Sequence, residues 1–230
     1  MKILFFTDCM SIGGGVPHDL MFPSIVAHNF LLCEIDNVVL DGMTTGEAAQ
    51  EIEKVVDRCP DIVVFGFGVN DALPRGLRRE QRGALIRWTY RVGMSKKIRL
   101  AFRTIFLNPL EYAKQVITKP KHYFTIDGMI SNIDYCMSAF HERGIQTVLI
   151  NIAPVLNYRF INALKHIEEY NRAIHGYCKS KSIPVVDAFT IFNEIGPGKA
   201  LAKDRFHYSE ASHKAVAVEL IKIINKIKEG

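Results

Sequence analysis

Short apolar runs alternate with longer amphipathic segments along this 230-residue chain. We interpret five apolar runs as strands, at residues 2–7, 34–40, 61–67, 145–152 and 183–186. Segments with helical spacing of apolar residues lie at 23–32, 44–58, 124–143, 160–181 and 210–228. The run DIVVFGF at 61–67 is almost continuously apolar, as in a strand that is buried on both faces.

This alternation predicts a three-layer α/β/α sandwich built on a five-stranded parallel sheet, in a single domain over residues 1–230. Ligands of such sheets bind beyond the carboxyl ends of the strands. The first three predicted strands end at Asp8-Cys9, at Gly42 and at Gly68–Asn70. We therefore expect a functional site where these three ends meet.

The composition is that of a globular protein, with 48% hydrophobic and 23% charged residues. No apolar run approaches the roughly 20 residues of a membrane helix. Asp8 interrupts the apolar start MKILFF and no small-residue cleavage site follows, so we interpret this start as a strand rather than a signal peptide. A cytoplasmic protein is predicted.

The five cysteines are odd in number, widely spaced and without a Cys-x-x-Cys pair. This pattern disfavours a disulfide framework or a structural zinc site and fits a reducing compartment. The eight histidines are scattered, with none at the i, i+4 spacing of a helical metal site. We expect neither a metal nor another cofactor.

One segment interrupts the alternation, and it holds the basic charge of the chain. Residues 75–121 contain thirteen Lys and Arg against two Glu, a net charge of +11, whereas the rest of the chain carries −6. Apolar residues at helical spacing predict two or three amphipathic helices, inserted as a lid or side arm. We expect this surface to attract an anion, with Arg78, Arg79, Arg82 and Arg87 as candidate ligands; a solvated basic helix face is the alternative.

Four short blocks carry the candidate chemistry. They are Phe6–Ser11 (FTDCMS), Asp41–Thr45 (DGMTT), Gly68–Asp71 (GVND) and Asp204–His207 (DRFH). In order, spacing and placement after strands, they resemble the four blocks of the SGNH (GDSL-like) hydrolase family. The resemblance implies a flavodoxin-like sandwich and acyl-ester chemistry, and it is silent on the basic segment.

The resemblance also implies roles for individual residues. Cys9 takes the position of the nucleophilic serine, with His207 as its base or thiolate partner and Asp204 as the orienting acid. The oxyanion donors are the backbone N–H groups of Cys9 and Gly42 and the side-chain amide of Asn70. Two further carboxylates, Asp8 and Asp71, are expected to brace the loops.

The cysteine is the one departure from the family pattern that bears on chemistry. A thiolate beside an imidazole attacks acyl carbons well, so a Cys-His-Asp triad is chemically sound. The alternatives are that Cys9 is a small buried hydrophobe in a lineage that has lost hydrolysis, or that serine was replaced on purpose.

We therefore expect an ester hydrolase or O-acyltransferase that forms a thioester on Cys9. The expected partner is a small-molecule or glycan ester. Further options are an acyl-carrier or coenzyme A donor and an anionic lipid surface. Binding to a lipid surface would place the protein at the periphery of a membrane. The alternative is a catalytically inactive binding or scaffold protein whose basic arm contacts an anionic partner. No nucleic-acid-binding signature accompanies the charge, and the sequence leaves the oligomeric state open.

Overall fold

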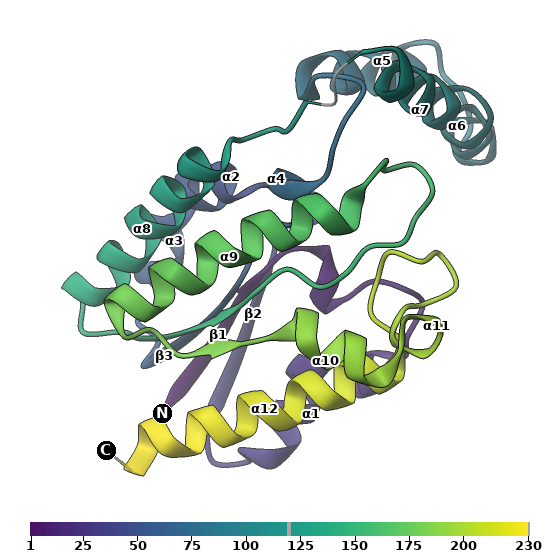
Figure 1. The fold of residues 1–230 in the computed structure, drawn as a ribbon. Coiled ribbons are helices and arrows are strands. Elements are labelled where there is room, and N and C mark those ends of the chain that lie inside the picture. The colour runs from purple at the N-terminus through teal and green to yellow at the C-terminus, as the bar shows by residue number, and fades with distance from the viewer. Residues whose placement is uncertain (119–120, 230) are drawn as a thin grey trace.

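A computed structural model describes residues 1–118 and 121–229. Its centre is a five-stranded sheet in which every strand pair is parallel, in the order β2-β1-β3-β4-β5 (Figure 1). The strands are β1 (Lys2–Thr7), β2 (Glu34–Val39), β3 (Ile62–Gly66), β4 (Gln146–Ile150) and β5 (Val185–Val186). The predicted number of strands and their parallel arrangement are confirmed.

Helices cover both faces of the sheet, which makes the fold a three-layer sandwich. One face packs against α1 (Phe22–Asn29), α10 (Ala188–Ile195) and α12 (Glu210–Glu229), and α12 contacts the other two helices (Figure 1). The other packs against α2 (Thr45–Gln50), α3 (Ile52–Val56), α8 (Ile126–Glu142) and α9 (Ala163–Lys181). The short elements are η1 (Cys9–Ser11), η2 (His18–Leu20), α4 (Val69–Ala72) and α11 (Pro197–Ala200).

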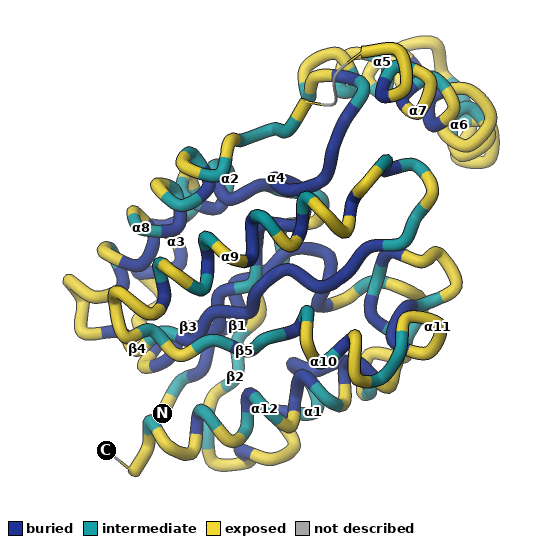
Figure 2. Tube along the Cα trace, viewed as in Figure 1, coloured by how far each residue is buried: buried dark blue, intermediate teal, exposed yellow. Residues whose placement is uncertain are grey.

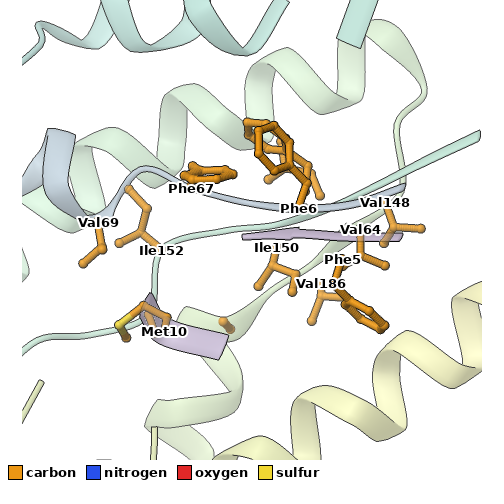
Figure 3. Packing of buried hydrophobic residues seen from close by; sticks show 14 of the residues in the cluster. Phe5, Phe6, Met10, Val64, Phe67, Val69, Val148, Ile150, Ile152 and Val186 are labelled. Atoms are coloured by element: carbon orange, nitrogen blue, oxygen red, sulfur yellow. The ribbon is translucent and has the colours of Figure 1, made fainter. Parts of the chain in front are cut away.

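The core lies between the sheet and these helices, and aromatic side chains fill much of it (Figures 2 and 3). The Phe6 ring lies 5.8 Å from that of Phe65 and 4.8 Å from that of Phe67, both at edge-to-face angles. Edge-to-face pairing is the arrangement that ring quadrupoles favour. This dry centre fixes the carboxyl ends of β1 and β3, from which the candidate site is built.

Several element boundaries differ from the prediction. The helix expected at 44–58 is two helices, α2 and α3, which are separated by Glu51 with a ψ of 0°. The helix expected at 160–181 begins only at Ala163, because Asn162 before it has a left-handed φ of +55°. Helix α10 was not predicted at all. Within the described residues, no helix has the length and apolar content needed to cross a membrane.

The basic segment contains an arm of helices that projects from the sandwich (Figure 1). We define the arm as residues 79–117, comprising α5 (Arg79–Arg91), α6 (Lys96–Phe102), the π-helical turn η3 (Arg103–Leu107) and α7 (Asn108–Ile117). The last three follow one another without a break, so they form one helix of 22 residues, about 33 Å long. At its base, Arg75 and Lys121 pair as an antiparallel bridge.

Candidate active site

Cys9 begins a single turn of 3-10 helix directly after β1. The carboxylate of Asp8 caps this turn by accepting the Met10 N–H at 2.9 Å, and the Asp8 N–H donates to the Gly66 carbonyl at the end of β3. The Cys9 N–H lies at the first position of the turn, where backbone donors have no partner within the helix. These contacts hold the thiol at the carboxyl edge of the sheet, where it is 7% exposed.

Burial disfavours ionisation of the Cys9 thiol. Burial is the main cause that raises its pKa well above the ordinary value, and the charge of Asp8 and the carboxylate of Asp41 raise it further. The Gly42 N–H beside the sulfur opposes them. Among the described residues, the hydrogen bond of the His207 ring is to Asp204, and none joins the ring to the Cys9 sulfur. Burial and the absence of this contact favour a neutral thiol over a thiolate–imidazolium pair.

His207 and Asp204 form a tight pair on the loop before α12. The His207 Nδ1 lies 2.6 Å from Asp204 Oδ2, and Asp204 Oδ1 accepts the N–H groups of Phe206 at 3.0 Å and of His207 at 3.1 Å. Burial alone would raise the pKa of Asp204, but these hydrogen bonds outweigh it and lower the pKa below its ordinary value. An ionised carboxylate only accepts, so Nδ1 carries the proton and Nε2 is left as a base.

Gly13 lies on the loop that follows Cys9, and it contacts this histidine. A Cβ atom built on Gly13 would lie 2.0 Å from Cδ2 of His207, so the imidazole ring rests directly on the Gly13 backbone. Any larger residue would push the ring away. The glycine run at 13–15 lacks the Gly-Lys-Ser/Thr that ends a phosphate-binding loop. Its first glycine positions the candidate base.

The Gly42 and Asn70 blocks are joined through side chains. The Asn70 Nδ2 donates to the Met43 carbonyl at 3.0 Å, and the Asp71 carboxylate accepts from the backbone N–H and hydroxyl of Thr45. Gly42 has a φ of +69°, a backbone conformation that favours glycine. These hydrogen bonds hold the two blocks together beside Cys9.

Arg75 completes this unit, and sequence reasoning missed it. Its guanidinium donates to Asn70 Oδ1 at 3.0 Å and lies between the rings of Tyr123, at 5.1 Å, and Phe160, at 4.7 Å. With the amide oxygen held by Arg75 and one amide hydrogen held by Met43, the second hydrogen of Asn70 remains as a donor.

Two of the buried carboxyl groups near Cys9 have raised pKa values. Burial raises the pKa of Asp8 to about 7, with the Met10 N–H opposing and the charges of Asp71 and Asp41 adding to the rise. Burial likewise raises the pKa of Asp71 to about 6, against the stabilising contacts from Thr45. In residues 1–118 and 121–229, no three His, Cys, Asp or Glu side chains gather as a metal site requires.

Two hollows rich in basic side chains include residues of the candidate site. One, of about 560 Å³, is lined by Gly42, Tyr123 and three of the predicted anion ligands, Arg79, Arg82 and Arg87. The other, of about 670 Å³, lies between the arm and the loops at 156–159 and 203–205, and includes Asp204. Its basic residues are Arg103, Arg159, Lys203 and Arg205.

The four predicted anion ligands differ in their surroundings. Arg79 forms an ion pair with Glu47 and donates to the Gly42 carbonyl at 3.2 Å, and Arg82 lies 3.5 Å from Glu111. Arg78 and Arg87 are exposed. Arg79 therefore supports the Gly42 turn as well as lining the hollow.

The model of the GDSL-like lipase/acylhydrolase family matches residues 11–215. The chain belongs to this family of ester hydrolases. The match includes Gly42, Asn70, Asp204 and His207 and begins two residues after Cys9. None of the curated proteins matches the sequence significantly.

Solved structures of GDSL-type and related ester hydrolases share the fold at low identity. A catalytic mutant of acetylxylan esterase from Geobacillus stearothermophilus superposes with a TM-score of 0.65 at 17% identity, over 96% of this chain and 92% of that one. The psychrotrophic esterase from a Pseudoalteromonas species superposes with a TM-score of 0.64 at 14% identity, over 100% of this chain and 99% of that one. The lipase/acylhydrolase from Enterococcus faecalis superposes with a TM-score of 0.64 at 17% identity, over 97% of this chain and 94% of that one. The fold expected from the four blocks is confirmed.

Proposed function

We propose that this GDSL-like protein hydrolyses an acyl ester, or transfers its acyl group, through a thioester on Cys9. The observation that supports the proposal best is the His207–Asp204 pair at 2.6 Å, whose Nε2 remains a base on a loop in contact with the loop that follows Cys9. A base held in one tautomer by an ionised carboxylate is what nucleophile activation requires.

The reaction begins with attack of the Cys9 sulfur on the ester carbonyl carbon. Because burial raises the pKa of the thiol and so favours its neutral form, the thiol proton passes to Nε2 of His207 as the sulfur–carbon bond forms. The N–H groups of Cys9 and Gly42 and the Asn70 amide donate to the negative oxygen. The alcohol then leaves with the proton from His207, and the acyl group stays on sulfur.

The thioester is resolved by water or by an acceptor hydroxyl. His207 takes the proton of that nucleophile, the oxygen–carbon bond forms, and the thiol leaves and regains a proton. Water completes hydrolysis, and an acceptor hydroxyl completes O-acyl transfer. The same residues serve both outcomes.

For the substrate, we favour an anionic or carbohydrate-linked ester. One basic hollow is lined in part by Gly42 and the other in part by Asp204, so each includes a residue of the candidate centre. A small-molecule or glycan ester with acidic groups, or an acyl donor on coenzyme A or an acyl carrier, would find cations in both hollows. All five cysteines are free, and we place this thiol chemistry in a reducing compartment.

The raised pKa of Cys9 favours one alternative, a binding or scaffold protein that no longer turns over esters. Intact-mass spectrometry after incubation with acyl donors separates the two. The enzyme should gain an acyl mass that is absent from Cys9→Ala and present in Cys9→Ser as an ester. An unmodified chain without turnover, in a protein that still binds the donor, would favour the scaffold.

The charge of the substrate is tested by comparing a neutral with an anionic ester. Arg87→Gln should raise KM for the anionic ester several-fold and leave the neutral one unchanged, because a surface charge acts only on a charged ligand. Arg143→Gln, beside the amino end of β4, is the matched control. Equal effects of the two variants would contradict the assignment.

A further inference from the structure

The long helix of the arm, residues 96–117, has two different faces. Its inner face is buried and holds the arm to the sandwich, and it includes Leu107, Asn108, Glu111 and Gln115. Gln115 donates to the Arg159 carbonyl at 2.7 Å and accepts the Ile161 N–H at 3.1 Å. Gly76 fits under this face so closely that a Cβ there would lie 2.1 Å from the Glu111 carbonyl oxygen. The arm is therefore fixed by one side only.

The outer face carries large apolar side chains in water. Ile105 is 76% exposed and Ile117 is 82% exposed, and Figure 2 shows the arm as one of the most exposed parts of the chain. Four exposed apolar residues of this helix recur at intervals of seven or four: Ile98, Ile105, Tyr112 and Val116. Phe106 and Ile117 are exposed beside them. An apolar patch of this extent on a protein surface marks an interaction site.

The arm that carries the apolar patch has a large excess of positive charge. Over residues 79–117 there are nine Lys and Arg against two Glu. One of those acids, Glu111, is buried against the sandwich near Arg82, so it does not face solvent. At the tip, where α5 turns into α6, Arg91, Lys96 and Lys97 are exposed.

We infer that the arm docks on an anionic phospholipid bilayer, with the outer face of the 96–117 helix lying in the plane of the headgroups. A helix with an apolar face, basic flanks and low net hydrophobicity is the type that binds at this depth. Anionic headgroups attract Lys and Arg near the surface, and the apolar side chains enter the acyl boundary. This inference concerns the arm alone and is independent of the proposed role of Cys9.

A second copy of the chain fits the same face less well. Pairing two arms face to face would bring two sets of nine basic residues together, and like charges at an interface oppose association. Burial against its own sandwich is excluded, because the inner face of the helix already occupies that contact. A bilayer satisfies both the charge and the apolar side chains.

The single tryptophan of the chain allows a direct test. Trp88 lies on the arm, 48% exposed, with its ring 6.0 Å from that of Phe102. The Cys9→Ala protein, which removes any turnover from the measurement, is titrated with phosphatidylcholine vesicles with and without phosphatidylglycerol at low salt. We expect the Trp88 emission to shift to the blue only with the anionic vesicles, and the protein to float with them.

Two arm variants and one matched control separate the contributions. Ile105→Ser with Ile117→Ser should weaken vesicle binding at least tenfold, and Arg91, Lys96 and Lys97 changed to Gln should do the same. Leu31→Ser with Leu32→Ser, at the exposed loop before β2, removes equal apolar surface outside the arm and should change nothing. Raising the salt towards 1 M, where the Debye length is about 3 Å, should release the wild type.

The inference is overturned if the wild type binds neutral and anionic vesicles alike, or if the Ile105 and Ile117 variant binds as tightly as the wild type. It is also overturned if size-exclusion chromatography shows a wild-type dimer that those two substitutions dissociate, because the outer face would then be a contact between copies. Circular dichroism of each variant, read at the same concentration, confirms that the arm remains helical in every comparison.

Discussion

The Arg75 guanidinium holds the amide oxygen of Asn70 at 3.0 Å, and so links the base of the basic arm to a predicted oxyanion donor. Arg75 is 5% exposed, and its side chain lies between the rings of Tyr123 and Phe160. Desolvation by this burial lowers the pKa of Arg75, yet the pKa of a guanidinium starts so high that it stays charged. The fixed positive charge of the guanidinium beside the amide oxygen determines which way the Asn70 amide faces.

Replacing Arg75 with Gln should therefore lower kcat and leave KM for a small neutral ester unchanged. The loss of one hydrogen bond to a charged group, about 1.5 kcal/mol, corresponds to roughly tenfold in kcat. Asn70→Ala should cost about 10² or more, because it removes the donor itself. Steady-state kinetics of both single variants and of the double variant form the measurement.

The double variant distinguishes positioning from stability. If Arg75 acts through Asn70, the double variant should have the kcat of Asn70→Ala alone. Arg159→Gln is the matched control, since Arg159 also packs on the Phe160 ring, at 5.2 Å, but donates to Asn157 and Asn108 instead. Additive losses in the Arg75 and Asn70 pair would contradict a shared role.

Gly13→Ala should lower kcat by about 10², because a displacement of the base by about 1 Å is enough for a loss of this size. The added Cβ would overlap the ring of His207, which cannot stay in place. Gly176→Ala is the control: nothing lies within 4 Å of a Cβ there, and alanine in the middle of α9 should stabilise the fold by up to about 1 kcal/mol. Wild-type turnover in Gly13→Ala would mean that His207 is not the base.

Much of this architecture could be predicted from local sequence, because local pattern determines it. The apolar run at 61–67 gave β3 to within one residue, and the block order placed Cys9, Gly42 and Asn70 at one edge of the sheet. Helix α10 was also readable in principle. Its cap Asp187 accepts the Thr190 N–H at 3.1 Å, a pattern of the kind that marks helix starts.

The contacts that could not be predicted join residues far apart in the chain. Nothing near Gly13 in sequence indicates that His207 rests on it, and nothing near Arg75 indicates Tyr123 and Phe160. The same holds for Asp41, which in the sequence is only the first residue of the DGMTT block. Its carboxylate beside the Cys9 sulfur becomes visible only when β1 and the turn after β2 are packed together.

Asp41→Asn should make Cys9 more reactive. The Asp41 carboxylate raises the pKa of the thiol through its charge and its contact, so its removal lowers that pKa. Each pKa unit lost raises the thiolate fraction about tenfold at a pH below the pKa. The measurement is the iodoacetamide rate at Cys9 by peptide mass at pH 8, with the exposed Cys59 as internal reference. A rate at Cys9 that stays the same relative to Cys59 would show that Asp41 does not act on the thiol.

Asp8→Asn should reveal how the buried carboxyl group beside Cys9 affects stability. Burial raises the pKa of Asp8 from 3.8 to about 7. Between these two values the folded protein keeps a proton that the unfolded chain has lost, so the free energy of unfolding falls as pH rises through this window. Three pKa units correspond to at most about 4 kcal/mol. Asparagine keeps an acceptor for the Met10 N–H but cannot ionise, so the variant escapes this loss.

The wild type and Asp8→Asn should therefore be equally stable at pH 4 and diverge above it, with the variant more stable at pH 8. Urea unfolding at several pH values measures the difference. Asp134→Asn is a control of opposite sign: the hydrogen bond from Lys181 lowers the pKa of Asp134, so its removal costs stability at pH 8 and little at low pH. If Asp8→Asn is no more stable than the wild type at pH 8, ionisation of Asp8 does not destabilise the folded protein. That result would contradict the raised pKa of Asp8.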